Sequence, residues 1–107
     1  MPICCSALQL MEVLVVPKVL EFGRFIIYFW SNENGEPIHV HVAEKTPSAN
    51  ATKIWLTKKG KCILAHNNGR IPNRELGELC EVIEANFFII LSEWKEHFCV
   101  EEVSFYC

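Results

Sequence analysis

The sequence predicts an α+β domain in which a mainly antiparallel sheet of four to five strands has one long C-terminal helix packed on one face. Two patterns carry this prediction. Between Lys18 and His66, short runs rich in β-branched and aromatic residues alternate with turn-forming residues, which is typical of strands joined by short links. Between Arg74 and Phe98, apolar residues recur at alternating steps of four and three, which is the spacing of one face of a helix.

The length of 107 residues and the hydrophobic content of 50% fit one domain with a core of its own. We divide the chain into an N-terminal extension, residues 1–16, and a single α+β domain, residues 17–107. The extension is apolar, and its pattern fits a short helix and an extended arm equally well. It lacks a basic start, and Glu12 interrupts it, so we do not expect a secretory signal.

Charge and cysteine content narrow the class of protein. The formal net charge of -3 means that the chain as a whole is not positively charged, so nucleic-acid binding would require a local basic patch. No apolar run reaches the roughly 18 residues of a membrane helix, and we expect no membrane partner. The 6 cysteines include no Cys-x-x-Cys pair, which favours mostly reduced thiols in a cytoplasmic protein over a disulfide framework.

The predicted strands are short and follow one another closely. A hairpin that turns at Gly23 joins the first two, and the second of them is apolar on both faces, as suits a central strand. Turn-forming residues separate the others, and the tail after Phe98 has room for an added strand at residues 100–105. In chain order, we expect the strands of the sheet at residues 18–22, 25–30, 38–44, 51–57 and 62–66.

The predicted helix runs from Arg74 to about Phe98, with Asn73 as its N-cap and Glu75 in the first turn, where the helix dipole favours an anion. Phe88 and Ile89 widen the apolar face beyond what one sheet needs, and this surplus predicts a homodimer or a small protein partner. The stripe expected to be buried consists of Leu76, Cys80, Ile83, Phe87, Ile90, Trp94 and His97.

The strongest chemical signal is the run Pro-Ile-His-Val-His-Val at residues 37–42. Alternate side chains of a strand share a face, so His39 and His41 should project side by side, about 7 Å apart. Val40 and Val42 should then point into the core. We expect the two imidazoles to be partly accessible and to form a site together with the polar loop that precedes them.

Three interpretations of the two histidines remain open. In the first, both imidazoles bind zinc or another divalent ion, and a third ligand comes from Glu33, Glu93, His66 or His97. In the second, the histidines are structural or bind a partner. In the third, one acts as base and the other as acid in cleaving RNA. A basic rim that could assist RNA binding consists of Arg24, Lys53, Lys58, Lys59, Lys61 and Arg70.

A Ser-Asn-Glu turn at residues 31–33 leads into the histidine run, and this combination resembles a small bacterial family known as domain of unknown function 4160. The resemblance covers roughly residues 17–98, so it implies nothing about the extension or the tail. The family has no agreed activity, but its members are similar to partners in toxin–antitoxin-like gene pairs. Further segments that carry the resemblance are residues 16–22, 28–30, 51–56 and 93–98.

We therefore expect a small cytosolic binding or regulatory module of a toxin–antitoxin-like pair, with a surface site around the histidine strand. The alternative is a small metal-dependent or histidine-based ribonuclease or hydrolase with His39 and His41 as its catalytic residues. Nucleic acid is a further candidate partner, and a divalent metal such as zinc is the candidate cofactor. The expected binding residues are Asn32, Glu33, His39, His41 and Arg70, and the expected metal ligands are His39 and His41 with Glu33, His66 or His97.

Overall fold

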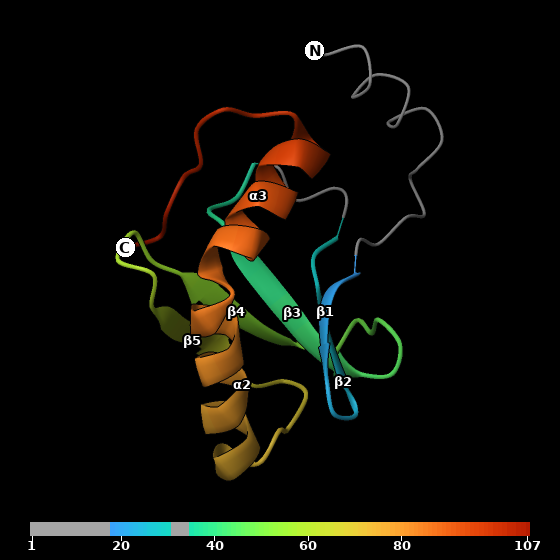
Figure 1. Cartoon of the computed structure of the whole chain (residues 1–107). Coiled ribbons are helices and arrows are strands. Elements are labelled where there is room, and N and C mark those ends of the chain that lie inside the picture. The colour runs from blue at the N-terminus through green and yellow to red at the C-terminus, as the bar shows by residue number, and fades with distance from the viewer. Residues whose placement is uncertain (1–17, 31–34) are drawn as a thin grey trace.

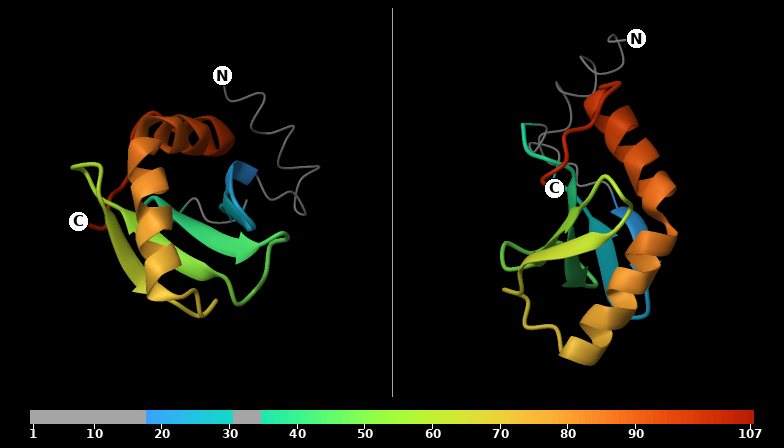
Figure 2. Two further views of the ribbon diagram at one scale, coloured as in Figure 1. Left: turned by 60° about the horizontal axis from the view of Figure 1, so that its bottom comes forward. Right: turned by 90° about the vertical axis from the view of Figure 1, so that its left-hand side faces the viewer.

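The computed structural model describes residues 18–30 and 35–107. It contains a five-stranded antiparallel sheet and two C-terminal helices that lie on one side of it (Figure 1 and Figure 2). The predicted α+β class and strand number are therefore confirmed. The elements are β1 (Lys18–Phe22), β2 (Phe25–Tyr28), β3 (His39–Glu44), β4 (Thr52–Leu56), β5 (Cys62–His66), α2 (Asn73–Ala85) and α3 (Phe87–Phe98).

The sheet is a meander, since its spatial order β1-β2-β3-β4-β5 is also the order in the sequence. Each strand pairs antiparallel with the next, and β3 is central between β2 and β4. Gly23 has φ +59 in the turn between β1 and β2, a conformation that glycine adopts without steric cost. This order is typical of strands joined by short connections, which favour antiparallel pairing of strands that are neighbours in sequence.

The prediction of one long helix is wrong, because α2 ends at Ala85 and α3 begins at Phe87. The views in Figure 2 show that the chain changes direction between α2 and α3. Asn86, between them, has φ -109 and ψ 23, and its Nδ2 donates to the carbonyl oxygen of Val82 at 2.8 Å. A short amide side chain that bonds to the backbone competes with helical hydrogen bonds, and it accounts for the break.

The core lies between the helices and one face of the sheet. The predicted helical stripe is only partly right: Leu76 and Cys80 are half-buried, and the fully buried Leu79 was not part of it. The predicted N-cap is shifted by one residue, since Pro72 is the N-cap and Asn73 starts α2. The residues of the sheet and of the helices that meet in the core include Ile27, Val40, Val42, Ile54, Leu56, Leu79, Ile83, Phe87, Ile90 and Trp94.

The tail after α3 crosses back to the sheet without forming the strand that we expected at residues 100–105. Cys99 ends α3 in the left-handed conformation, with φ 54. Two hydrogen bonds then hold the tail: Ile38 N donates to Ser104 O at 2.9 Å, and Lys58 N donates to Cys107 O at 3.1 Å. The tail therefore lies against the beginning of β3 and the end of β4.

Neither α2 nor α3 is long and apolar enough to cross a membrane, and the same holds for every helix within the described residues. The thiols of Cys62, Cys80 and Cys107 are free, as expected for reduced cysteines, whereas Cys99 is disulfide-bonded. The predicted N-terminal extension, residues 1–16, lies outside the described residues.

Candidate functional site

His39 and His41 project from the same side of β3, opposite to Val40 and Val42, which lie in the core. Their ring centroids are 5.0 Å apart. The predicted pairing is thus present, but the expected accessibility is wrong: the exposed fraction is 0% for His39 and 8% for His41. The alternation of the strand determined the shared face, and aromatic side chains from other elements cover it.

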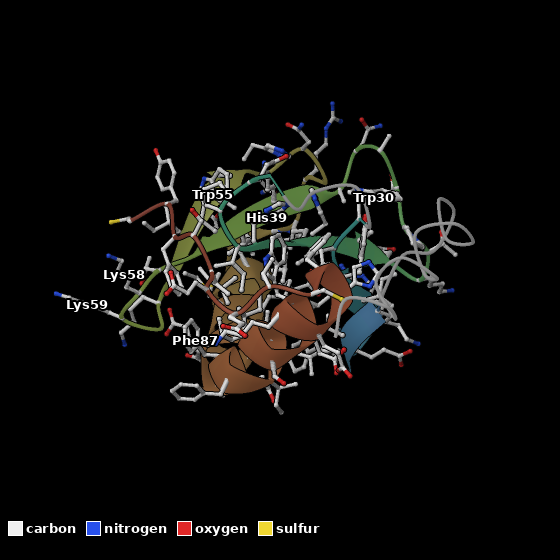
Figure 3. All side chains as sticks on the ribbon, turned by 90° about the horizontal axis from the view of Figure 1, so that it is seen from above. Trp30, His39, Trp55, Lys58, Lys59 and Phe87 are labelled. Carbon is white, nitrogen blue, oxygen red and sulfur yellow. The ribbon has the colours of Figure 1, made fainter. Side chains whose placement is uncertain are left out.

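The imidazole of His39 is held in one orientation. Its Nδ1 lies 2.8 Å from the carbonyl oxygen of Pro37, and a carbonyl can only accept, so Nδ1 carries the proton. In the neutral ring, Nε2 then has the lone pair, which is the arrangement found in metal-ligating and basic histidines. The rings of Trp55 and Trp94 lie 5.5 Å and 5.4 Å away. The ring is therefore well positioned for chemistry but enclosed (Figure 3).

The ring of His41 lies between the ring of His39 and the aromatic side chains of β2 and of the residues that follow it. Its ring lies 5.6 Å from Tyr28 and 6.3 Å from Trp30, and those two rings contact each other edge to face at 5.4 Å. In the register of β3 and β4, His41 is paired with Lys53. We refer to this set as the histidine face, and it consists of Tyr28, Trp30, His39, His41, Lys53 and Trp55.

Lys53 supplies the positive charge of the histidine face. Its Nζ bonds Glu36 Oε1 at 2.8 Å and lies 4.4 Å from the centre of the Trp55 ring. The ammonium group is therefore held by a carboxylate and an aromatic face together. The sequence pattern indicated Lys53 only as part of a general basic rim and did not indicate its ion pair with Glu36. The period-two alternation of β4, which puts Lys53 and Trp55 on one face, was the signal that could have located it.

The other predicted ligands do not join the histidine pair. His66 ends β5, where its Nδ1 accepts from Asn68 N at 3.4 Å. His97, on α3, contacts the rings of Phe29 and Phe98 at 5.5 Å and 4.9 Å. Among the residues that the structure describes, no group of three His, Cys, Asp or Glu side chains could hold a metal ion. Asn32 and Glu33 lie outside these residues.

Arg70 belongs to a different part of the molecule. It adopts a left-handed conformation with φ 56 in a loop that is tied to β4. Asn67 Oδ1 accepts from Thr52 Oγ1 at 2.7 Å, and Gly69 N donates to the same hydroxyl at 3.1 Å. Arg70 lines a pocket of about 690 Å³ to which neither histidine of β3 contributes. The structure thus separates Arg70 from the histidine pair.

The positive charge of the second arginine in this pocket is already paired. Arg24 donates from Nη1 and Nη2 to the two carboxylate oxygens of Glu75, at 2.6 Å and 2.7 Å, and from Nε to Glu44 Oε2 at 2.9 Å. These hydrogen bonds raise the pKa of Arg24, the one with Glu75 most. Arg24 therefore connects the turn between β1 and β2 with β3 and α2 and is not a free cation for a ligand.

Cys62 and Cys80 form a pair of neighbouring thiols between β5 and α2. Cys62 Sγ lies 3.8 Å from the carbonyl oxygen of Cys80. The hydrogen bond from Cys62 lowers the pKa of Cys80 to about 7, while the same interaction, followed by burial, raises the pKa of Cys62. Cys80 is therefore the more acidic thiol of the pair.

Comparison with known proteins places the chain in a family. No curated protein and no solved structure matches it. The family model described as domain of unknown function (DUF4160) matches residues 25–95, which contain the whole histidine face, Arg70 and most of α3. The match begins after residues 16–22, so it does not extend to that part of the resemblance. With this match over most of its length, the chain belongs to the DUF4160 family.

Proposed function

We propose that this protein is a small cytosolic binding module that works with a small protein partner in a toxin–antitoxin-like pair. The proposed site is the histidine face with its rim. One observation carries this proposal: an array of aromatic and imidazole rings spans β2, β3 and β4 and ends in the ion pair of Lys53 with Glu36. The pairing with a toxin or antitoxin rests on the resemblance of the family to such gene pairs.

Burial favours binding over catalysis at this site. With exposed fractions of 0% and 8%, His39 and His41 offer no open access to a substrate. Trp30, Trp55 and Lys53 are partly exposed, and they are the side chains of this face that a partner would touch. Aromatic residues at the centre of a patch with charges at its edge are typical of the residues that dominate protein interfaces.

The alternative, a metal-dependent or histidine-based ribonuclease or hydrolase, has support in the orientation of His39. Nδ1 donates to Pro37 O, which leaves Nε2 as the ligand or base. The described residues supply two imidazoles without a third ligand, so a divalent ion such as zinc would need a further one. Zinc uptake or RNA cleavage that is lost on substituting His39 or His41 would favour this alternative.

A test of the proposal compares two lysines, each of which pairs with one glutamate. Lys53 pairs with Glu36 on the histidine face, and Lys18 pairs with Glu21 on β1. Lys53→Met and Lys18→Met each remove one ammonium group and keep an apolar stem. The chain and the product of the gene proposed to be paired with its own are purified separately, and the dissociation constant of their complex is measured by calorimetry. We expect about a tenfold loss of affinity for Lys53→Met, corresponding to about 1.4 kcal/mol, and little change for Lys18→Met.

Two results would contradict the proposal. Equal affinity of both variants and the unchanged chain would exclude the histidine face as the interface. If the chain forms no complex with the product of that gene, the proposed pairing with a toxin or antitoxin is wrong. Circular dichroism melting of both variants controls for folding, since Lys53→Met also breaks a partly buried ion pair.

A further inference from the structure

We propose that one edge of this protein binds single-stranded nucleic acid by stacking a base on Tyr106 and contacting phosphates through lysines of the turn between β4 and β5. This edge shares Trp55 with the histidine face, but the proposal does not require the protein partner proposed above. We refer to it as the stacking edge, and it consists of Trp55, Lys58, Lys59 and Tyr106.

The ring of Tyr106 lies on the ring of Trp55 in a parallel stack. The centroids are 4.8 Å apart, and the interplanar angle is 5°. Tyr106 nevertheless remains 59% exposed, so much of its ring is open to solvent. An exposed aromatic ring backed by a second ring is a platform on which any base can stack, because every base has a π face.

The tail holds this platform in place before any ligand arrives. Ser104 O accepts from Ile38 N and Cys107 O accepts from Lys58 N, so hydrogen bonds fix the backbone on both sides of Tyr106. Phe105, between them, packs against the core. A ring that is already ordered loses little conformational entropy on binding, which favours a role as a contact residue.

Two lysines lie in the turn beside the end of the tail that carries Tyr106. The hydrogen bond from Lys58 N to Cys107 O places Lys58 beside the end of the tail, and Lys59 follows it in the turn. Figure 3 shows Lys58 and Lys59 extending from the side of the molecule where Trp55 lies. Neither forms an ion pair with any described residue, whereas Lys61 is paired with Glu84 at 4.0 Å. The charges of Lys58 and Lys59 are therefore available to phosphate groups.

The chemistry of this edge selects a nucleic-acid strand over a simple anion. Phosphate or an acidic peptide would satisfy the lysines but would leave the stacked ring unused, whereas a single strand presents bases and phosphates together. The net charge of -3 does not prevent this, because charges beyond about 8 Å are largely screened at physiological salt. We expect no sequence preference, since stacking and phosphate contacts carry none.

The test measures fluorescence anisotropy of labelled oligouridine and oligothymidine of about eight nucleotides, a length within the range of one small binding domain. The full chain is used in about 50 mM salt, where phosphate contacts are strong. Tyr106→Phe keeps the ring and should bind within about twofold of the unchanged chain. Tyr106→Ala should weaken binding about tenfold, in line with the loss of one stacking contact.

The charges are tested with matched double variants. Lys58→Glu with Lys59→Glu changes the stacking edge, while Lys18→Glu with Lys45→Glu makes the same change in net charge elsewhere on the surface. We expect about tenfold or greater loss for the first pair and less than about threefold for the second, because phosphate contacts act locally. Affinity should also fall as salt is raised.

Three outcomes would overturn the proposal. The first is no binding of either oligonucleotide by the unchanged chain. The second is equal loss in the two double variants, which would show only a general effect of charge. The third is equal affinity of Tyr106→Ala and Tyr106→Phe for the oligonucleotides, together with equally tight binding of inorganic polyphosphate. This result would show that the edge binds polyanions in general and that Tyr106 does not stack on a base.

Discussion

Nδ1 of His39 and the carbonyl oxygen of Pro37 lie 2.8 Å apart, joined by a hydrogen bond across two residues. This bond orients the imidazole at the first position of β3, between the rings of Trp55 and Trp94. The contact is possible because the carbonyl precedes the strand and is free of the ladder between β3 and β4. His39 therefore joins the connection before β3 to the aromatic cluster.

The first prediction concerns the stability that this arrangement contributes. His39→Ala should reduce the free energy of unfolding by roughly 2 kcal/mol or more, because it removes a fully buried ring and leaves a cavity. His39→Asn should lose less, since its amide can still donate to Pro37 O. Urea denaturation followed by circular dichroism measures both. If His39→Ala is as stable as the unchanged chain, the ring is not a structural element.

The second prediction compares two adjacent phenylalanines at the start of α3. Phe87 is 8% exposed and Phe88 is 78% exposed. Phe87→Ala should therefore cost about 3–5 kcal/mol, whereas Phe88→Ala should change stability by less than about 0.5 kcal/mol. Thermal or chemical unfolding of the two variants provides the measurement. Similar costs would mean that the side chain of Phe87 does not pack in the core.

The third prediction concerns association. Phe88 and Ile89 are 78% and 51% exposed on α3, as the surplus of apolar residues in the sequence predicted. We expect a homodimer through this surface, and Phe88→Glu should weaken it by placing a charge in an apolar contact. Light scattering at several protein concentrations, with Leu64→Glu on β5 as a control, tests this. A monomer at the highest concentration would reject the dimer.

The fourth prediction follows from the thiol pair. The hydrogen bond from Cys62 lowers the pKa of Cys80 to about 7, and a thiolate rather than a thiol reacts with alkylating agents. The alkylation rate of Cys80 should therefore rise as the pH increases through about 7 and then level off. Cys62→Ala removes the donor, so the midpoint should move upward, towards the ordinary value of about 8.5.

Mass spectrometry of the alkylated peptides separates Cys80 from Cys107, which is exposed and outside the pair. Cys107 is thus an internal control for reagent concentration and for the pH dependence of the reagent itself. A midpoint that stays near 7 in Cys62→Ala would show that Cys62 is not the cause of the lowered pKa.

The strands and the shared face of the histidines could be predicted because both depend on neighbours in sequence. Alternation within residues 37–42 is enough to put His39 and His41 together. Their burial could not be predicted, since it depends on Trp55 and Trp94, which come from β4 and α3. A pattern within one strand contains no information about which distant side chains cover it.

The helix break illustrates a different limit. The apolar spacing continues from Ile83 through Phe87 to Ile90, so periodicity alone predicts one helix. Asn86 carries the contrary signal, because asparagine has a low helix propensity and bonds to nearby backbone. A single unfavourable residue is often tolerated within a helix, and only the structure shows that Asn86 separates two helices.

The meander topology of the sheet affects the order in which contacts form during folding. Each strand pairs only with the strand next to it in sequence, so the sheet can grow progressively from short-range contacts, which favours rapid folding. The tail is the exception, since Ser104 and Cys107 must return to Ile38 and Lys58. These closures join residues far apart in the sequence, so they cost more loop-closure entropy than the strand pairings. We therefore expect the stack of Tyr106 on Trp55 to form after the strand pairings.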